Sequence, residues 1–155
     1  QPERYRAIVM HSGIAPGIAH SAATALGAMR GRRAAVPLEP LAPGQHLPPL
    51  LVIQGTADPI VAAGNGAEAA GLWAAREGAV AGAQRTVQRG KHYAAMVTDY
   101  RAGGRLVATL CLIQGLGHAW SGGASGVGYS DPKGPDASRM IWTYASRQFA
   151  GTRRA

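Results

Sequence analysis

The sequence is poor in cysteine, aromatic residues and charge: its 155 residues include one cysteine, 6% aromatic and 15% charged side chains. The single cysteine, Cys111, excludes a disulfide within the chain and a metal site built on several thiolates. No apolar run is long enough to span a membrane, and the first residues lack the pattern of a signal peptide. No Gly-x-Ser-x-Gly motif occurs, which excludes one common way of presenting a nucleophilic serine.

Acidic residues are also scarce, since eight carboxylates stand against 16 basic side chains and give a formal net charge of +8. Such an excess can indicate binding to nucleic acid or to an anionic surface. The arginines are scattered, however, with short clusters only at residues 30–33 and 153–154. We therefore expect no nucleic-acid partner and interpret the charge as a compositional bias, with nucleic-acid binding as a distant alternative.

Apolar residues make up 46% of the chain, enough for one domain with a buried core, and 22 glycines and 10 prolines indicate many turns. We assign residues 1–150 to this domain and 151–155 to a frayed tail. Apolar patterning predicts strands near residues 6–10, 50–55, 93–101 and 105–114, and helices near 19–30, 63–77 and 136–149. We expect loops or irregular structure at 34–49, 79–92 and 115–135.

This order of elements favours an α/β fold, namely a parallel sheet with flanking helices and a local hairpin at residues 102–104. The continuous apolar run at 50–55 is typical of a parallel strand that is buried on both faces. Polar, turn-rich segments follow three predicted strands, at residues 11–13, 56–58 and 117–118. Because parallel strands end at one edge of a sheet, we expect these segments to form a ligand site there.

Asp58 and His118 are the candidate catalytic residues at that edge. A carboxylate after a strand can hold a histidine in one tautomer, and the histidine can then act as a general base. The alternatives are ordinary turn chemistry for Asp58, which precedes Pro59, and a surface position for His118. No His, Asp or Glu cluster has metal-ligand spacing, and we expect neither a metal nor a cofactor.

A nucleophile is harder to find in the sequence. Ser125 lacks the second flanking glycine and a preceding strand, and Ser12 has Met10 and Ile14 where glycines are needed. Cys111 lies inside an apolar run, where a buried and inert thiol is expected.

The other histidines are weaker candidates than His118 for the general base. His11 and His20 each precede a serine, but neighbouring side chains of a strand point to opposite faces, so we do not expect a dyad from either pair. His46 and His92 fall in loop-like stretches, where we expect them to be solvated.

Four segments resemble one known family. They are Pro-Glu-Arg-Tyr-Arg-Ala with His-Ser-Gly at residues 2–13, Gly-Thr-Ala-Asp-Pro-Ile-Val at 55–61, Gly-Leu-Gly-His-Ala-Trp-Ser-Gly-Gly at 115–123 and Tyr-Ser-Asp-Pro-Lys-Gly-Pro-Asp-Ala-Ser at 129–138. They are similar to the C-terminal half of the secreted polyhydroxybutyrate depolymerase-type and feruloyl-esterase-like enzymes, which have the α/β-hydrolase fold. The resemblance covers nearly the whole chain.

The resemblance implies that Asp58 is the acid and His118 the base of a Ser-Asp-His triad. The serine and the oxyanion-hole amides of that family lie upstream of the segment matching Gln1, so the resemblance implies that the N-terminal half of the fold is missing. Trp120, unless it is a packed core indole, and Ser12 are the expected substrate-binding residues. Asp136 is expected to cap a helix rather than to act in catalysis.

The function implied is hydrolysis of small-molecule or polymeric carboxylic esters, such as hydroxyalkanoate polyesters, feruloyl-type esters or short acyl esters. The family is secreted, which implies an extracellular location. We expect the isolated chain to be inactive, because it lacks the serine, and to associate through an exposed sheet edge. Two alternatives stay open: a non-catalytic remnant or binding module of the hydrolase fold, and a serine peptidase of the same fold.

Overall fold

A computed structural model describes residues 2–151 of the chain. Its main sheet contains six strands. They are β1 (Ile8–His11), β2 (Leu50–Gly55), β3 (Val80–Ala81), β4 (Arg85–Val87), β5 (Ala95–Ala102) and β6 (Arg105–Ile113). The other elements are the 3₁₀ turn η1 (Pro2–Arg4), the helices α1 (Ala22–Met29), α2 (Gly64–Arg76) and α3 (Ala137–Gly151), and a two-stranded pair, β7 (Trp120–Ser121) and β8 (Ser130–Asp131).

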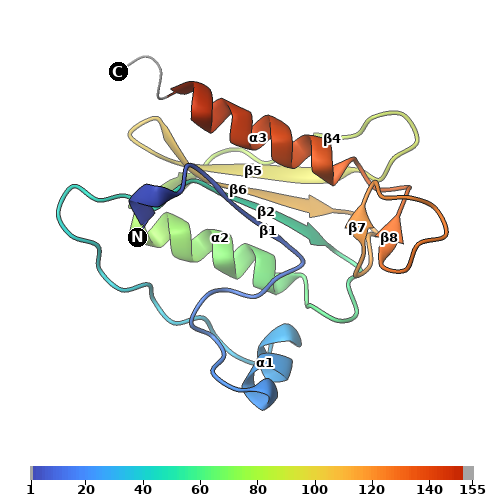
Figure 1. The fold of residues 1–155 in the computed structure, drawn as a ribbon, viewed down its shortest axis with the longest axis horizontal. Coiled ribbons are helices and arrows are strands. Elements are labelled where there is room, and N and C mark those ends of the chain that lie inside the picture. Colours follow the sequence, from blue (N-terminus) through green and yellow to red (C-terminus); the bar gives the residue numbers. More distant parts are fainter. Residues whose placement is uncertain (1, 152–155) are drawn as a thin grey trace.

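The main sheet is mixed, with the order β1-β2-β6-β5-β3, and β4 also pairs with β5 (Figure 1). Strands β1, β2 and β6 are parallel, whereas β5 runs antiparallel to β6. Gly103 and Gly104 connect β5 to β6, and both have the positive φ that a tight hairpin turn requires. The predicted parallel strands and local hairpin are therefore confirmed, within a mixed α/β architecture.

Two helices cover opposite faces of this sheet, with α3 on one side and α2 on the other (Figure 1). Along β2, Leu50 and Val52 belong to the core that contains Trp73 of α2. The alternate residues Leu51 and Ile53 belong to the core that contains Tyr144 of α3. All six residues of β2 are buried, so the prediction of a strand covered on both faces is confirmed.

The predicted helices are also present, and their ends follow from local chemistry. Ser21 caps α1, which is shorter than the predicted 19–30, and Gly31 follows its end with a φ of 68°. The carboxylate of Asp136 accepts the N–H of Arg139 at 2.9 Å, so Asp136 caps α3 as expected.

Two predicted loops contain strands instead. Residues 79–92 were expected to be irregular, but β3 and β4 lie within them and pair with β5. Residues 115–135 contain β7 and β8, which pair with each other over two residues. Each of these four strands has only two or three residues, which is too short for an apolar periodicity to mark it in the sequence.

Strand β1 has one partner, β2, within residues 2–151, and its other edge carries no pairing there. The same described part of the chain contains no helix with both the length and the apolar character needed to cross a bilayer. Of the predicted tail, Gly151 is the last residue of α3. Residues 152–155 lie outside the described residues, as does Gln1.

Candidate active site

The site lies where the parallel strands β2 and β6 end side by side, with Gly55 opposite Ile113. The loops that follow are joined by a hydrogen bond from the Ala57 N–H to the Leu116 carbonyl, at 3.1 Å. A Cβ atom on Gly55 would lie 2.2 Å from that carbonyl oxygen, a contact that no side chain can make. This close approach of the two loops therefore requires glycine at position 55, and it brings the residues after β2 beside those after β6.

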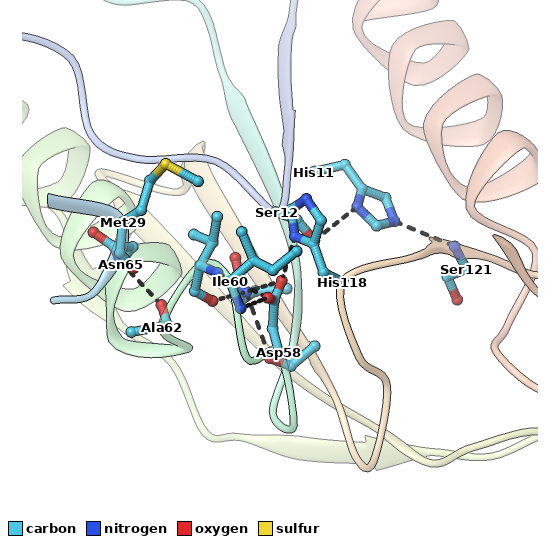
Figure 2. A network of polar contacts seen from close by, with 12 residues as sticks. His11, Ser12, Met29, Asp58, Ile60, Ala62, Asn65, His118 and Ser121 are labelled. Atoms are coloured by element: carbon cyan, nitrogen blue, oxygen red, sulfur yellow. Dashed lines mark hydrogen bonds and ion pairs between the residues drawn. The ribbon is translucent and has the colours of Figure 1, made fainter. Parts of the chain in front are cut away.

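Asp58 and His118 meet at this junction. The Nδ1 atom of His118 lies 2.9 Å from Oδ2 of Asp58, although the two residues are 60 positions apart in the chain (Figure 2). The Asp58 side chain is fully buried, whereas 29% of the His118 side chain is exposed. The carboxylate is thus shielded from water while the imidazole can still be reached from outside.

The two oxygens of Asp58 have separate partners. Oδ1 accepts the N–H groups of Ile60 and Val61, at 2.9 and 2.8 Å, and Oδ2 faces His118. Burial raises the pKa of Asp58, but the hydrogen bonds from Val61, His118 and Ile60 outweigh it and leave the pKa below its ordinary value. The turn role and the histidine-orienting role, which are alternatives in the sequence, are both present in the structure.

Gln54 is a further member of the site that the sequence analysis missed. Its side chain is fully buried beneath Asp58, and its amide nitrogen donates to Asp58 Oδ2 at 3.3 Å and to the Val61 carbonyl at 3.0 Å. A polar residue in the otherwise apolar run of β2 was the available signal, because a buried amide needs hydrogen-bond partners.

This arrangement fixes what His118 can do. The ionised Asp58 accepts a hydrogen bond from the N–H at Nδ1 of His118. Nε2 then carries the free lone pair and can accept a proton from an attacking hydroxyl group. The rings of Tyr129 and His118 lie nearly perpendicular to each other, with ring centres 5.9 Å apart. The geometry is therefore that of a general base with an orienting carboxylate.

His11 also belongs to the site, as expected from its place after the first predicted strand, but its contacts were not predicted. Its ring stacks on Trp120, with ring centres 4.9 Å apart. Its Nε2 accepts the N–H of Ser121 at 3.4 Å, as Figure 2 shows. Burial first, and then the nearby His118, lower the pKa of His11, and Asp58 opposes this shift only in part. A neutral His11 therefore links the end of β1 to the loop that carries His118.

The expectation that His11 and Ser12 cannot pair was wrong. Nδ1 of His11 lies 3.2 Å from the Ser12 hydroxyl, and because Nε2 accepts from Ser121, the proton on Nδ1 is the one donated. The alternation of strand side chains ends here, since Ser12 has a φ of 51°, in the left-handed region. This backbone conformation at the end of β1 thus brings the side chains of His11 and Ser12 together.

The remaining predicted residues lie in different surroundings. Trp120 is 41% exposed rather than packed in the core, and its indole N–H donates to the Ser138 hydroxyl at 3.3 Å. Ser125 is exposed in the loop between β7 and β8, away from any strand end. Cys111 is buried in β6, and burial raises the pKa of its thiol to about 11, which agrees with an inert thiol.

The other histidines do not join the site. His20 and His92 are exposed. His46 is exposed as well, as expected, and its Nδ1 lies 2.8 Å from a carboxylate oxygen of Glu77. The same oxygen accepts a hydrogen bond from Arg105 at 2.6 Å. Residues 2–151 contain no group of three or more His, Cys, Asp or Glu side chains that could hold a metal ion.

Comparisons with known proteins leave the family open. Neither a scan against models of protein families nor a search among curated proteins finds a match to this chain. The function must therefore be argued from the site itself.

Proposed function

We propose that this chain supplies the base and the orienting acid of a carboxylic-ester hydrolase that works through a serine nucleophile. The observation that carries this proposal is the 2.9 Å contact between His118 and a fully buried Asp58 at the ends of two neighbouring parallel strands. In this role His118 takes the proton of the serine hydroxyl and returns it to the leaving alcohol, while Asp58 stabilises the imidazolium.

The fold proposed with this chemistry is the C-terminal part of an α/β-hydrolase of the polyhydroxybutyrate depolymerase type. The parallel strands β1, β2 and β6, with helices on both faces, support it, as does the order in which Asp58 precedes His118. The substrates proposed are hydroxyalkanoate, feruloyl or short acyl esters, and the location is extracellular.

In this proposal the nucleophile comes from outside the 155 residues. Serines near His118 have other tasks in the structure: the Ser121 hydroxyl donates to the Pro135 carbonyl at 2.6 Å, and Ser12 pairs with His11. The exposed face of His118, with its free Nε2, is where the missing serine and the ester would meet.

The experiment compares the 155-residue chain with the product of the whole gene, using p-nitrophenyl butyrate, a feruloyl ester and a peptide substrate. We expect the longer product to hydrolyse an ester, and His118→Ala to lower kcat by a factor on the order of 10⁴ or more. His20→Ala is the matched control, because His20 is exposed and lies just before α1. This variant should leave kcat unchanged.

Three results would overturn parts of this proposal. Esterase activity of the 155-residue chain that disappears in Ser12→Ala would move the nucleophile into this chain and replace His118 by His11 as its partner. Cleavage of peptides in preference to esters would establish a serine peptidase of the same fold. No hydrolysis by any form would favour a non-catalytic binding module.

A further inference from the structure

A second site lies away from the Asp58–His118 pair, in a cavity of about 520 Å³ between α3 and the strands β4 and β5. Figure 1 shows α3 running along the sheet beside these strands. Neither Asp58, His118 nor His11 lines this cavity. Its volume falls in the range of small-molecule pockets, about 300–1,000 Å³.

The interior of the cavity is apolar. Its floor is the α3-facing side of the sheet, where Leu51 and Ala95 are almost fully buried, and Met140 of α3 adds a flexible wall. Val87 of β4 lines the opposite wall and is 39% exposed. A ligand with an apolar body would cover this surface and remove it from water.

The rim of the cavity carries positive charge from two directions. Arg139 and Arg147 project from α3 with Thr143 between them, at the four-residue spacing that places side chains on one helix face. Arg85 and Arg89 line the cavity from β4 and the residues just after it. Segments about 50 residues apart in sequence thus bring their guanidinium groups to one opening.

Three of these four arginines lack an acidic partner within residues 2–151. Arg85 binds Asp99 at 3.1 Å, but no carboxylate lies within ion-pair distance of Arg89, Arg139 or Arg147 in that part of the chain. Asp136, the one acidic residue that lines the cavity there, is occupied in capping α3. The opening therefore presents guanidinium groups whose planar donors match a carboxylate.

We propose that this cavity binds an amphiphilic carboxylate, with its apolar chain on the floor between α3 and β5 and its carboxylate at Arg139 and Arg147. The site goes beyond the proposed esterase function and does not depend on it, since none of the residues involved belongs to the Asp58–His118 pair. Charge complementarity at the rim selects the anion, and the apolar floor selects a chain over a free carboxylate such as acetate.

The experiment follows the methyl resonances of the purified protein while decanoate is added below its micelle-forming concentration. We expect saturable shifts at Met140, Val87 and Val97, and none at Ile60 or Val61 beside Asp58. Decanol should bind at least about tenfold more weakly, because it lacks the charge that the arginines contact, and decyltrimethylammonium should not bind.

Arg139→Gln with Arg147→Gln should weaken decanoate binding about tenfold or more, because charge-assisted hydrogen bonds are lost. Arg4→Gln with Arg6→Gln is the matched control, since it removes the same charge from two exposed arginines that do not line the cavity. The proposal would be overturned if both double variants bound decanoate equally well, or if decyltrimethylammonium bound as well as decanoate. It would also be overturned if decanoate shifted other methyl groups instead, or if no shift were saturable. None of these readouts requires esterase activity, so failure here leaves the proposed reaction standing.

Discussion

At the scale of single residues, Asp58 shows how one side chain can serve structure and chemistry together. One oxygen closes the turn after β2 by accepting two backbone N–H groups, and the other orients His118. His11 has a comparable double contact, stacking on Trp120 while it accepts the N–H of Ser121. Both residues hold loops in place through titratable groups, so the stability of these loops depends on the pH.

Asp58→Asn should remove both the orienting charge and part of the stability of the chain. The pKa of Asp58 is lowered in the folded state, so its contribution is fully present above its unfolded pKa of about 3.9 and is lost as the pH falls through the lower folded pKa. We expect the variant to be less stable by about 1–3 kcal/mol at pH 7, because charged hydrogen bonds become neutral ones. Urea unfolding measures the difference, which should shrink below about pH 4.

Glu39→Gln is the control for this prediction, because Glu39 is exposed and its carboxylate makes no hydrogen bond or ion pair within residues 2–151. Its stability should match the wild type at both pH values. A gap between Asp58→Asn and the wild type that stays constant from pH 7 to pH 3 would contradict the linkage argument.

His11→Gln should flatten the pH dependence of stability in mildly acidic solution. Because the pKa of His11 is lowered in the folded state, the unfolded chain binds the proton first, and stability declines as the pH falls below about 6.5. Glutamine removes this titration while keeping polar atoms at the end of β1. Unfolding in urea at pH 7.5 and pH 5.5 should show a smaller loss for His11→Gln than for the wild type, and the same loss in both proteins would refute the prediction.

At the scale of elements, the site depends on how closely the loops after β2 and β6 approach. Gly55 is the last residue of β2, and the Leu116 carbonyl lies where its Cβ would be. The glycines of the hairpin, Gly103 and Gly104, act differently, since their positive φ values form the turn that places β5 beside β6. Glycine therefore serves close packing in the first case and turn geometry in the second.

Gly55→Ala should destabilise the protein and disturb His118. Its Cβ would meet backbone atoms that cannot rotate away, so we expect a cost of about 1–3 kcal/mol. Gly71→Ala in α2 is the control, because nothing lies within 4 Å of its Cβ position and alanine favours a helix by up to about 1 kcal/mol. Thermal unfolding should move the midpoints in opposite directions, and the imidazole resonances of His118 should shift only in Gly55→Ala. A stable Gly55→Ala variant with an unchanged His118 would contradict this account.

At the scale of the whole molecule, β1 forms an edge of the sheet that the described residues leave unpaired. The N–H groups of Ile8 and Ser12 bond to the strand region of β2, so the N–H of Val9 points to the open edge. The four residues of β1 are partly exposed. An edge of this kind can add a strand from another chain.

We expect purified protein to associate as its concentration rises, and sedimentation velocity measures this directly. Val9→Pro should reduce association, because it removes an outward N–H without breaking a bond to β2. Val36→Pro, in the exposed proline-rich loop, is the control and should associate like the wild type. A monomer at all concentrations that unfolds cooperatively would rule out the exposed edge as an attachment site.

The sequence by itself determined the elements whose information is local. A continuous apolar run marked β2, Asp136 marked the start of α3, and paired glycines marked the hairpin. It also determined that Asp58 and His118 follow strands. Because parallel strands end together, this alone predicted that the two side chains would meet.

Only the tertiary structure decided the features that depend on distant partners. Strands β3 and β4 exist because β5 offers them hydrogen bonds. The contacts of His11 with Trp120 and Ser121 join segments that are far apart in the chain. The arginine rim likewise combines α3 with β4. Local sequence patterns reflect backbone preference and burial. These contacts instead arise from packing between distant segments, so no single stretch of sequence predicts them.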